Sequence, residues 1–222
     1  MNFTISKSFD TRVDKSDRVL EVAEAFGLGL TDKRFEIYQN LEISLEPGDV
    51  CYISGQSGSG KSLLLNDLRD QFKAAGKIVY DIADVPLLDV PIVDQIGKNT
   101  EEALKLLSQA GLNDAYLFIR KPKELSDGQK YRFRLAKLIE SKAEVWCADE
   151  FAAVLDRDTA KVVSHNISKI AKQMGVILLV ATTHTDLKEY LGPTVTIEKL
   201  YGTRVELQSL KWKLETPNDL GD

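Results

Sequence analysis

The sequence predicts an α/β fold built around a mainly parallel sheet. Short apolar segments with the character of buried strands alternate along the chain with charged helical segments, which is typical of strands joined by crossover helices. A glycine-rich stretch at residues 55–62 lies between one such strand and one such helix. In open sheets of this kind ligands bind at the carboxyl ends of the strands, so the functional residues are expected there.

The chain before the glycine-rich stretch predicts an N-terminal antiparallel β portion and one short helix. Residues 2–9 alternate as an edge strand does, and residues 35–45 have the composition of one or two strands. Asp17 is the expected N-cap of a helix over residues 17–28. The turn at residues 46–49, Glu-Pro-Gly-Asp, leads into the strand before the glycine-rich stretch.

The rest of the chain predicts the alternation that the fold needs. Two prolines exclude a regular helix from residues 85–91, Thr100 is the expected N-cap of the next helix, and Gly111 and Gly175 stand where helices should end. The expected helices are residues 63–72, 101–110, 126–141 and 159–174. The expected strands are residues 77–82, 144–148 and 176–181, with a closing hairpin of 194–198 and 203–207.

Length and composition indicate a single domain over residues 1–222. The formal net charge of −5 gives no general attraction to nucleic acid or to an anionic membrane. The longest purely aliphatic run, residues 176–181, is far shorter than the roughly 20 apolar residues of a membrane-spanning helix, and the N-terminus lacks the apolar core of a signal peptide. We therefore expect a cytoplasmic protein with a disordered tail at about 215–222, and with Cys51 and Cys147 in its core.

The glycine-rich stretch fills every fixed place of the phosphate-loop pattern G-x-x-x-x-G-K-[ST]. It consists of Gly55, Gln56, Ser57, Gly58, Ser59, Gly60, Lys61 and Ser62. The glycines let backbone N–H groups turn inward around an anion, and the N-terminus of the following helix adds partial positive charge. Lys61 would reach the β- and γ-phosphates, and the Ser62 hydroxyl would hold Mg²⁺. The sequence therefore predicts a P-loop NTPase that binds a nucleoside triphosphate with magnesium.

Two further strands are expected to deliver reactive side chains to the same edge of the sheet. The strand at residues 144–148 ends in Asp149 and Glu150. One such carboxylate can hold the Mg²⁺ shell while the next polarises the attacking water as general base. His184 follows the strand at residues 176–181. Strand order in such sheets would put this strand between the strands that end at Gly55 and Asp149, and His184 is therefore expected near the γ-phosphate.

The start of the charged helix at residues 126–141 has a second pattern that could bind an anion. Ser126 is a good N-cap, and the simplest interpretation of Ser126, Asp127, Gly128 and Gln129 is a capped helix start. The alternative is an anion site made of a serine hydroxyl, a glycine that permits close backbone approach and a helix N-terminus. Two phosphate-binding devices in one chain are puzzling for a single triphosphate.

Taken in this order, the motifs resemble those of the ATP-binding cassette (ABC) ATPase superfamily, and the resemblance covers residues 35–207. It implies that two copies pair head to tail, so that Ser126, Gly128 and Gln129 of one copy complete the site at the loop of the other. ATP would be bound with Mg²⁺ and hydrolysed at this homodimer interface. The implied roles are general base for Glu150, metal support for Asp149, interface crossing for Asp156, γ-phosphate switch for His184, and contact with Mg²⁺ and the attacking water for Gln95.

The chain departs from the family pattern at several places. Asp127 stands where the second glycine of the signature is usual, and Phe151 follows Glu150 where proline is usual. The aromatic residue that stacks on adenine has two candidates, Phe35 and Tyr38, and neither aligns cleanly. These two candidates leave the base that the site selects open.

The helical subdomain is expected to be reduced, at about residues 96–142. Gln95 lies only 30 positions before Leu125. Transporter cassettes build in this interval the helices that hold the membrane subunit, so a short interval argues against a transporter. The phrases at residues 125–136, 149–157 and 180–187 look closest to a poorly characterised soluble branch, some of whose members are fused to a predicted acetyltransferase domain and some encoded by viruses.

The sequence leaves three tasks open. We favour a soluble dimeric ATPase that acts as a conformational switch on a macromolecular partner. The second is the nucleotide-binding subunit of an ABC transporter, with a membrane permease as partner. The third is a nucleic-acid-associated ATPase of the DNA repair or packaging type, because residues 120–137 hold seven basic residues against two acidic ones, although a solvated helix face explains these charges more simply. A module that binds without hydrolysis is disfavoured because Glu150 and His184 are both present.

Overall fold

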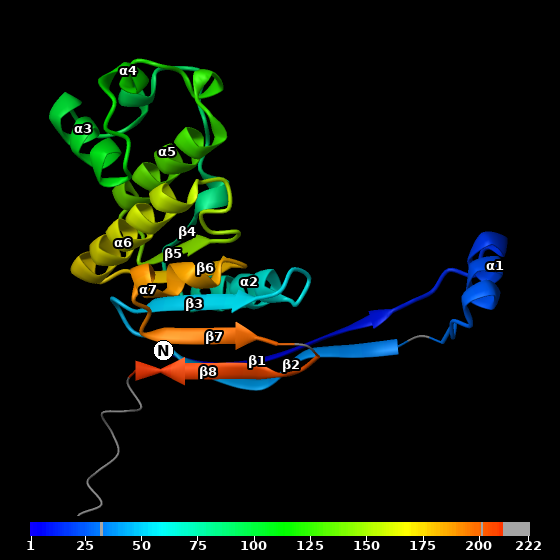
Figure 1. The fold of residues 1–222 in the computed structure, drawn as a ribbon. Helices are drawn as coiled ribbons and strands as arrows, with labels where there is room; N and C mark the ends of the chain where they lie inside the picture. The colour runs from blue at the N-terminus through cyan, green and yellow to red at the C-terminus, as the bar shows by residue number, and fades with distance from the viewer. Residues whose placement is uncertain (32, 201, 211–222) are drawn as a thin grey trace, which may run out of the picture.

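The computed structural model describes residues 1–31, 33–200 and 202–210. It confirms a mixed α/β fold in which helices pack on a mainly parallel sheet and a separate antiparallel pair of strands lies at the N-terminus (Figure 1). The expected disordered tail at about 215–222 lies outside the described residues, as does Tyr201.

The main sheet of the described residues has the strand order β4-β5-β6-β3-β7-β8. Its strands are β3 (Val50–Gly55), β4 (Val79–Asp81), β5 (Val145–Ala148), β6 (Ile177–Thr182), β7 (Val195–Lys199) and β8 (Val205–Ser209). All neighbours run parallel except β7 and β8, which form the expected antiparallel hairpin. The central position of β6, between β3 and β5, is the order that would bring His184 toward the phosphate loop.

Helices cover both faces of this sheet and enclose two hydrophobic cores. On one face α2 (Lys61–Ala74) buries Leu64, Leu68 and Phe72 in one core. The other core lies under α6 (Arg157–Met174) and α7 (Lys188–Leu191), and extends to the helices that stand above the sheet in Figure 1. These are α3 (Thr100–Gln109), α4 (Ala115–Phe118) and α5 (Asp127–Glu140).

Two helix starts differ by one residue from the expected ones. Ser16 rather than Asp17 caps the first helix, because its hydroxyl accepts a hydrogen bond from Val19 N, and Asn99 rather than Thr100 caps α3 by accepting from Glu102 N. A cap must hold extended dihedrals just before the first helical residue, and both neighbours are already helical. The helix expected at residues 159–174 starts two residues earlier, with Asp156 as its cap.

The N-terminal strands form a long hairpin that leaves the rest of the molecule. β1 (Asn2–Thr11) pairs antiparallel with β2 (Lys33–Ser44), and α1 (Asp17–Phe26) stands at the tip. The inner part is buried through residues such as Phe3, Ile5 and Tyr38. Farther out, the rings of Phe9 and Phe35 stack across the strands and are about half exposed. Figure 1 shows that the outer part and α1 project away from the sheet.

Gly55 ends β3 in a conformation that only glycine can adopt here. Its φ is 146°, and a Cβ at this position would lie 2.4 Å from the carbonyl oxygen of Lys199, its partner in β7. Gly58 also has a positive φ, of 73°, but a Cβ there would meet nothing within 4 Å. The close approach of β3 to β7 therefore fixes where the phosphate loop begins.

This difference predicts unequal costs for two alanine substitutions. Gly55→Ala should lower the free energy of unfolding by about 2–4 kcal/mol, because it adds a backbone clash to the strain of a positive φ. Gly58→Ala adds only the backbone strain of a positive φ and should lower the free energy of unfolding by about 1–2 kcal/mol. Urea denaturation of the two variants measures both values, and equal losses would contradict the steric account.

Candidate functional site

The carboxyl ends of three adjacent strands meet at one edge of the sheet. β3 runs into the phosphate loop, β5 runs into Asp149 and Glu150, and β6 leads through Thr182 to His184. The predicted loop, carboxylate pair and histidine are thus brought to one place by the strand order.

The phosphate loop has the features of an anion cradle. Gly55, Gly58 and Gly60 all have positive φ values. α2 begins at Lys61, and the residue before it, Gly60, offers no side-chain cap, so the first N–H groups of the helix remain directed at the loop. The buried Ser59 hydroxyl has no hydrogen-bond partner in the structure. These donors without protein partners fit a bound phosphate chain.

Lys61 is held within the loop. Its side chain is buried, and Nζ donates to the carbonyl oxygen of Gln56 at 2.6 Å. Burial lowers the pKa of Lys61, and the nearby charges of Asp149 and Glu150 oppose that shift. Ser62 follows in the first turn of α2 and is exposed. The lysine and the two carboxylates therefore share one electrostatic environment.

The two carboxylates follow β5 in a turn with unusual backbone geometry. Glu150 and Ala152 have φ values of 47° and 59°, in the left-handed region, and the N–H of Glu150 donates to Asp149 Oδ1 at 2.9 Å. Glu150 is exposed, so its carboxylate can meet a water molecule. Among the residues described, no cluster of three or more His, Cys, Asp or Glu side chains could hold a metal by itself. A Mg²⁺ ion held by Ser62, Asp149 and phosphate oxygens fits this donor set.

Hydrogen bonds tie the position of His184 to the carboxylate turn. Thr182 Oγ1 donates to the carbonyl oxygen of Phe151 at 3.2 Å and accepts from the N–H of His184 at 3.2 Å. The hydroxyl of Tyr52 donates to the carbonyl oxygen of His184 at 2.5 Å. The backbone of His184 is therefore fixed relative to β3 and to the turn after Glu150, while the residue as a whole is partly buried.

Ser126 and Gln129 form a reciprocal capping box at the start of α5. Ser126 Oγ accepts from Gln129 N, and Gln129 Oε1 accepts from Ser126 N at 2.9 Å. Gly128 lies close to the segment before α6, since a Cβ there would be 3.3 Å from Leu155 Cδ2. Asp156 caps α6. Within the described part of the chain no hydrogen bond or ion pair joins Ser126, Gly128, Gln129 or Asp156 to the phosphate loop.

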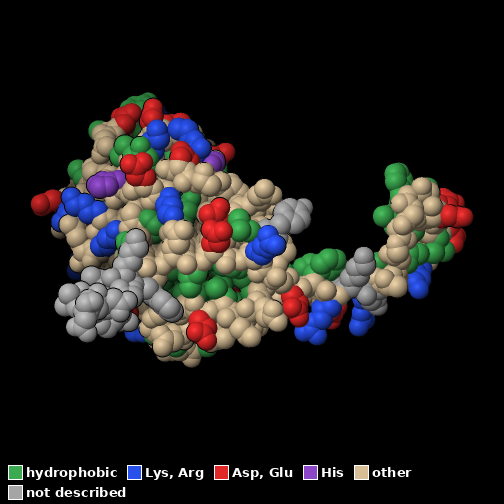
Figure 2. Space-filling model, turned by 60° about the horizontal axis from the view of Figure 1, so that its bottom comes forward, with side chains coloured by type: hydrophobic (Ala, Val, Ile, Leu, Met, Phe, Trp, Pro, Cys, Tyr) green, Lys and Arg blue, Asp and Glu red, His purple; other side chains and the backbone are tan. Residues whose placement is uncertain are grey.

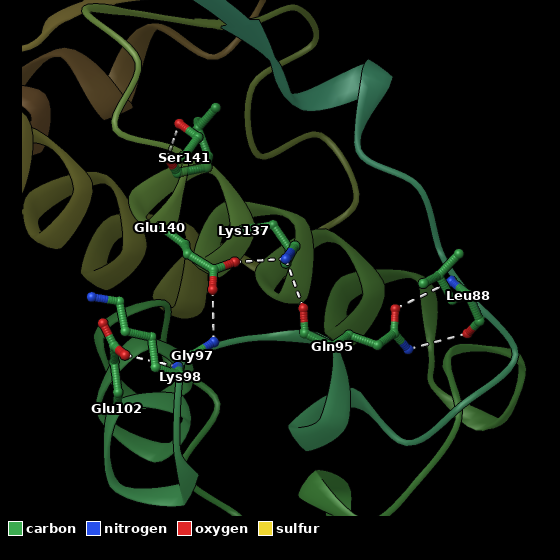
Figure 3. A network of polar contacts seen from close by, with 9 residues as sticks. Leu88, Gln95, Gly97, Lys98, Glu102, Lys137, Glu140 and Ser141 are labelled. Atoms are coloured by element: carbon green, nitrogen blue, oxygen red, sulfur yellow. Dashed lines mark hydrogen bonds and ion pairs between the residues drawn. The ribbon is translucent and has the colours of Figure 1, made fainter.

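The side chain of Gln95 is engaged in hydrogen bonds within its own segment. Its amide exchanges hydrogen bonds with Leu88 and donates to the carbonyl oxygen of Val90, closing the loop of residues 85–91 (Figure 3). Its own carbonyl oxygen accepts from Lys137 on α5. In this arrangement Gln95 braces the connection between the sheet and α3, and contact with Mg²⁺ would require its side chain to turn.

Of the two candidate aromatic residues for base stacking, Tyr38 is not available. Its ring is buried in the core, and its hydroxyl donates to the carbonyl oxygen of Gly60 at 2.9 Å. Burial raises the pKa of this hydroxyl. Phe35 is 45% exposed and remains the candidate of the pair.

Tyr131 is a residue that the motif analysis did not single out. It lies on α5, where burial raises the pKa of its hydroxyl, and this hydroxyl accepts from the N–H of Ala152 at 3.0 Å. Its ring meets that of Phe151 edge-on at 6.3 Å. Tyr131 thereby connects the capped helix α5 to the turn that carries Glu150. In the sequence Tyr131 is an aromatic residue within the basic segment at residues 120–137, and nothing there indicates a contact with the turn after Glu150.

The basic segment at residues 120–137 is largely engaged within the protein. Arg132 donates to the carbonyl oxygens of Gly128 and Gly111, and Lys137 bonds Gln95 and Glu140. Such contacts support the interpretation of a structural, partly solvated face over that of a nucleic-acid surface.

The comparisons with known proteins agree with this geometry. The family model described as "ABC transporter" matches residues 38–153. The lipoprotein-releasing system ATP-binding protein LolD of Geobacter metallireducens is 24% identical over 80% of this chain and 93% of its own length. The cytochrome c biogenesis ATP-binding export protein CcmA of Reclinomonas americana is 31% identical over 68% of this chain and 79% of its own length.

A solved structure shows the same fold. It is a dimeric, post-hydrolysis state of an ATP-binding cassette bound to ADP and Pi, which aligns with a TM-score of 0.66 and 17% identity over 95% of this chain and 99% of the other. Phosphate loop, carboxylate strand and family match thus converge, and the chain belongs to the ABC transporter family of ATP-binding cassettes.

Proposed function

We propose that the chain hydrolyses ATP in a site completed by a second copy, and that it serves as the nucleotide-binding subunit of an ABC transporter. As a member of its family the chain is an ATPase that uses ATP with Mg²⁺. The roles of single residues are part of the proposal: the residues Gly55 to Ser62 hold the phosphates, Ser62 and Asp149 hold the metal, Glu150 activates water and His184 senses the γ-phosphate.

The observation that carries the composite site is the separation of its parts within one chain. The capping box at Ser126 and Gln129 presents a helix N-terminus and a hydroxyl to solvent, yet among the described residues no hydrogen bond or ion pair links it to the loop of the same chain. A head-to-tail pair would bring these groups to the γ-phosphate held by the other loop. Asp127, whose side chain is 82% exposed, would then add a negative charge near that phosphate, which Lys130 offsets through an ion pair at 3.3 Å.

Support for a permease partner comes from the relatives and from a surface groove. Proteins that match this chain carry names of lipoprotein-releasing, cytochrome c biogenesis export and α-hemolysin translocation systems. The short interval after Gln95 folds into α3, α4 and a groove of about 450 Å³ between them, lined by residues such as Val93, Leu104 and Phe118. This groove suits a short helix of a membrane subunit, and it adjoins the segment that Gln95 braces. Among the described residues no helix is long and apolar enough to cross a membrane, so the membrane part would belong to the partner.

The second candidate is the soluble switch on another macromolecule. The short distance from Gln95 to Leu125 favours it, because it leaves little helix beyond α3 and α4 to hold a large membrane subunit. If the chain belongs to the soluble branch whose members include acetyltransferase fusions and viral cassettes, this second candidate is the expected task. In both cases the chain itself would act in the cytoplasm.

The first prediction concerns the general base. Glu150→Gln should lower ATP turnover about a hundredfold or more, since it removes a group that accepts a proton from the attacking water. The variant should also convert from monomer to dimer on addition of ATP, measured by light scattering. Glu144→Gln, at the opposite end of β5, is the matched control and should keep normal turnover. Normal turnover in Glu150→Gln would refute the assignment.

The second prediction concerns Tyr131 as a positioning residue. Tyr131→Phe leaves the buried N–H of Ala152 without an acceptor and should cost about 1–3 kcal/mol of unfolding free energy. Because Ala152 lies in the turn that carries Glu150, kcat should fall severalfold while the KM for ATP stays unchanged. Tyr116→Phe on the exposed α4 is the control. If Tyr131→Phe lowers the stability but leaves kcat unchanged, Tyr131 contributes only to the packing of the core.

The third prediction distinguishes the two candidate tasks. The chain should sediment with membrane vesicles prepared from the cells that encode it, and not with protein-free vesicles of the same lipids. Leu104→Glu, which puts a charge into the groove, should abolish sedimentation and leave the basal ATPase rate intact. If the chain stays in the supernatant in every case, the transporter proposal fails and the soluble switch is favoured.

A further inference from the structure

The outer part of the N-terminal hairpin and its helix, residues 9–31 and 33–35, form an arm that carries unburied apolar side chains. On α1 only Ala23 is buried. Leu20, Val22 and Phe26 are 43%, 51% and 75% exposed, and Leu28 after the helix is 58% exposed. An isolated helix of this length would be marginal in water, so a face of this kind calls for a covering partner.

The charges on the arm restrict what that partner can be. Asp17, Glu21 and Glu24 outnumber Arg18 on α1, and all are exposed. In Figure 2 hydrophobic side chains gather on this helix and acidic side chains lie on its outer side. An acidic helix is repelled by anionic lipid and by nucleic acid. The surface that fits it is apolar and bears positive charge.

The chain itself carries such a surface at residues 116–123. The ring of Tyr116 is 61% exposed, and the guanidinium of Arg120 lies over it at 4.2 Å from the ring centre. Lys121 and Lys123 extend the positive charge, which Glu124 and Asp89 offset only in part. The aliphatic stems of these cations add apolar area beside the ring.

Within one molecule the two surfaces lie apart. Figure 1 shows α4 at the top of the helical region and α1 at the far tip of the arm, well separated from each other. The arm, however, leaves the body beside the phosphate loop. A Cβ atom added to Gly60 would lie 2.7 Å from Ile37 Cγ2, and the hydroxyl of Tyr38 donates a hydrogen bond to the carbonyl oxygen of Gly60. The arm continues toward the side to which β3 points in Figure 1.

We propose that the arm of each copy clasps the surface at residues 116–123 of the second copy. The inference rests on the proposed head-to-tail pairing, in which Ser126 of the second copy comes to the phosphate loop from which the arm departs. Residues 116–123 precede Ser126 directly in the chain, and η3 (Pro122–Glu124) leads into its cap. The same approach that completes the ATP site therefore brings the basic surface to the side of the acidic helix α1 at the tip of the arm.

Charge exchange in the Glu150→Gln background tests the contact. Glu21→Lys with Glu24→Lys should raise the concentration for half-maximal ATP-dependent dimerisation about tenfold, and Arg120→Glu with Lys123→Glu should do the same. The four changes combined should restore dimerisation to within about threefold of the parent, because opposite charges face each other again. Glu42→Lys with Glu206→Lys, an equal change of charge outside the arm, is the control and should have little effect.

Each outcome decides between the arm and the pairing on which it rests. A Glu150→Gln parent that stays monomeric with ATP overturns both. If the Glu150→Gln parent dimerises and the arm variants dimerise equally well, the proposed arm contact is wrong while the head-to-tail pairing stands. The same conclusion follows if the combined variant dimerises no better than either set of changes alone.

A second measurement is independent of affinity: chains with Glu24→Cys and chains with Lys123→Cys, mixed with ATP under oxidising conditions, should form a disulfide-linked heterodimer. The native Cys51 and Cys147 are buried and should not interfere. A mixture that forms no linked heterodimer would contradict the clasp.

Discussion

The parallel pairing of β6 with both β3 and β5 is the constraint on which the site depends. Backbone hydrogen bonds hold these three strands in register, and their carboxyl ends place the phosphate loop, His184 and the two carboxylates at one edge. The sheet also fixes the loop from its other side, because Gly55 passes against the carbonyl oxygen of Lys199 in β7. The groups proposed for catalysis are therefore positioned by buried backbone.

The helix start at Ser126 and Gln129, which is the other half of the expected site, makes no hydrogen bond or ion pair to the phosphate loop of its own chain among the described residues. It is nevertheless connected to the turn that carries Glu150. α5 carries the capping box at its start, and one and a half turns later Tyr131 holds the N–H of Ala152. Thr182 continues the connection from Phe151 to His184. If a second copy displaced α5, these hydrogen bonds would therefore carry the displacement to Glu150 and His184 of the same chain as that α5. Physical contact of this kind is the means by which two sites can share one switch.

The sequence predicted the parallel sheet, the strand order and the convergence of the three motifs, because apolar runs and the phosphate loop are local and strong signals. It placed Asp17 and Thr100 as caps one residue late, since several polar residues compete at each helix start. It could not predict that Tyr38 is buried or that Gln95 bonds Leu88, because both depend on packing between distant segments. It expected only a short helix at residues 17–28, and nothing in the apolar pattern showed that this helix would stand at the tip of a projecting hairpin. The short interval after Gln95 favours a soluble switch, whereas matched relatives carry names of transport systems, and the length of a segment does not show which partner its surface binds.

Complementation between two inactive chains tests the composite site most directly. One chain carries Lys61→Ala in the phosphate loop and the other carries Ser126→Arg at the start of α5. In a mixed dimer the intact loop of one chain meets the intact helix start of the other, so mixing should restore ATP hydrolysis to about a quarter of the unmodified rate. If the mixture stays as inactive as either chain alone, hydrolysis does not take place in a site shared between two copies.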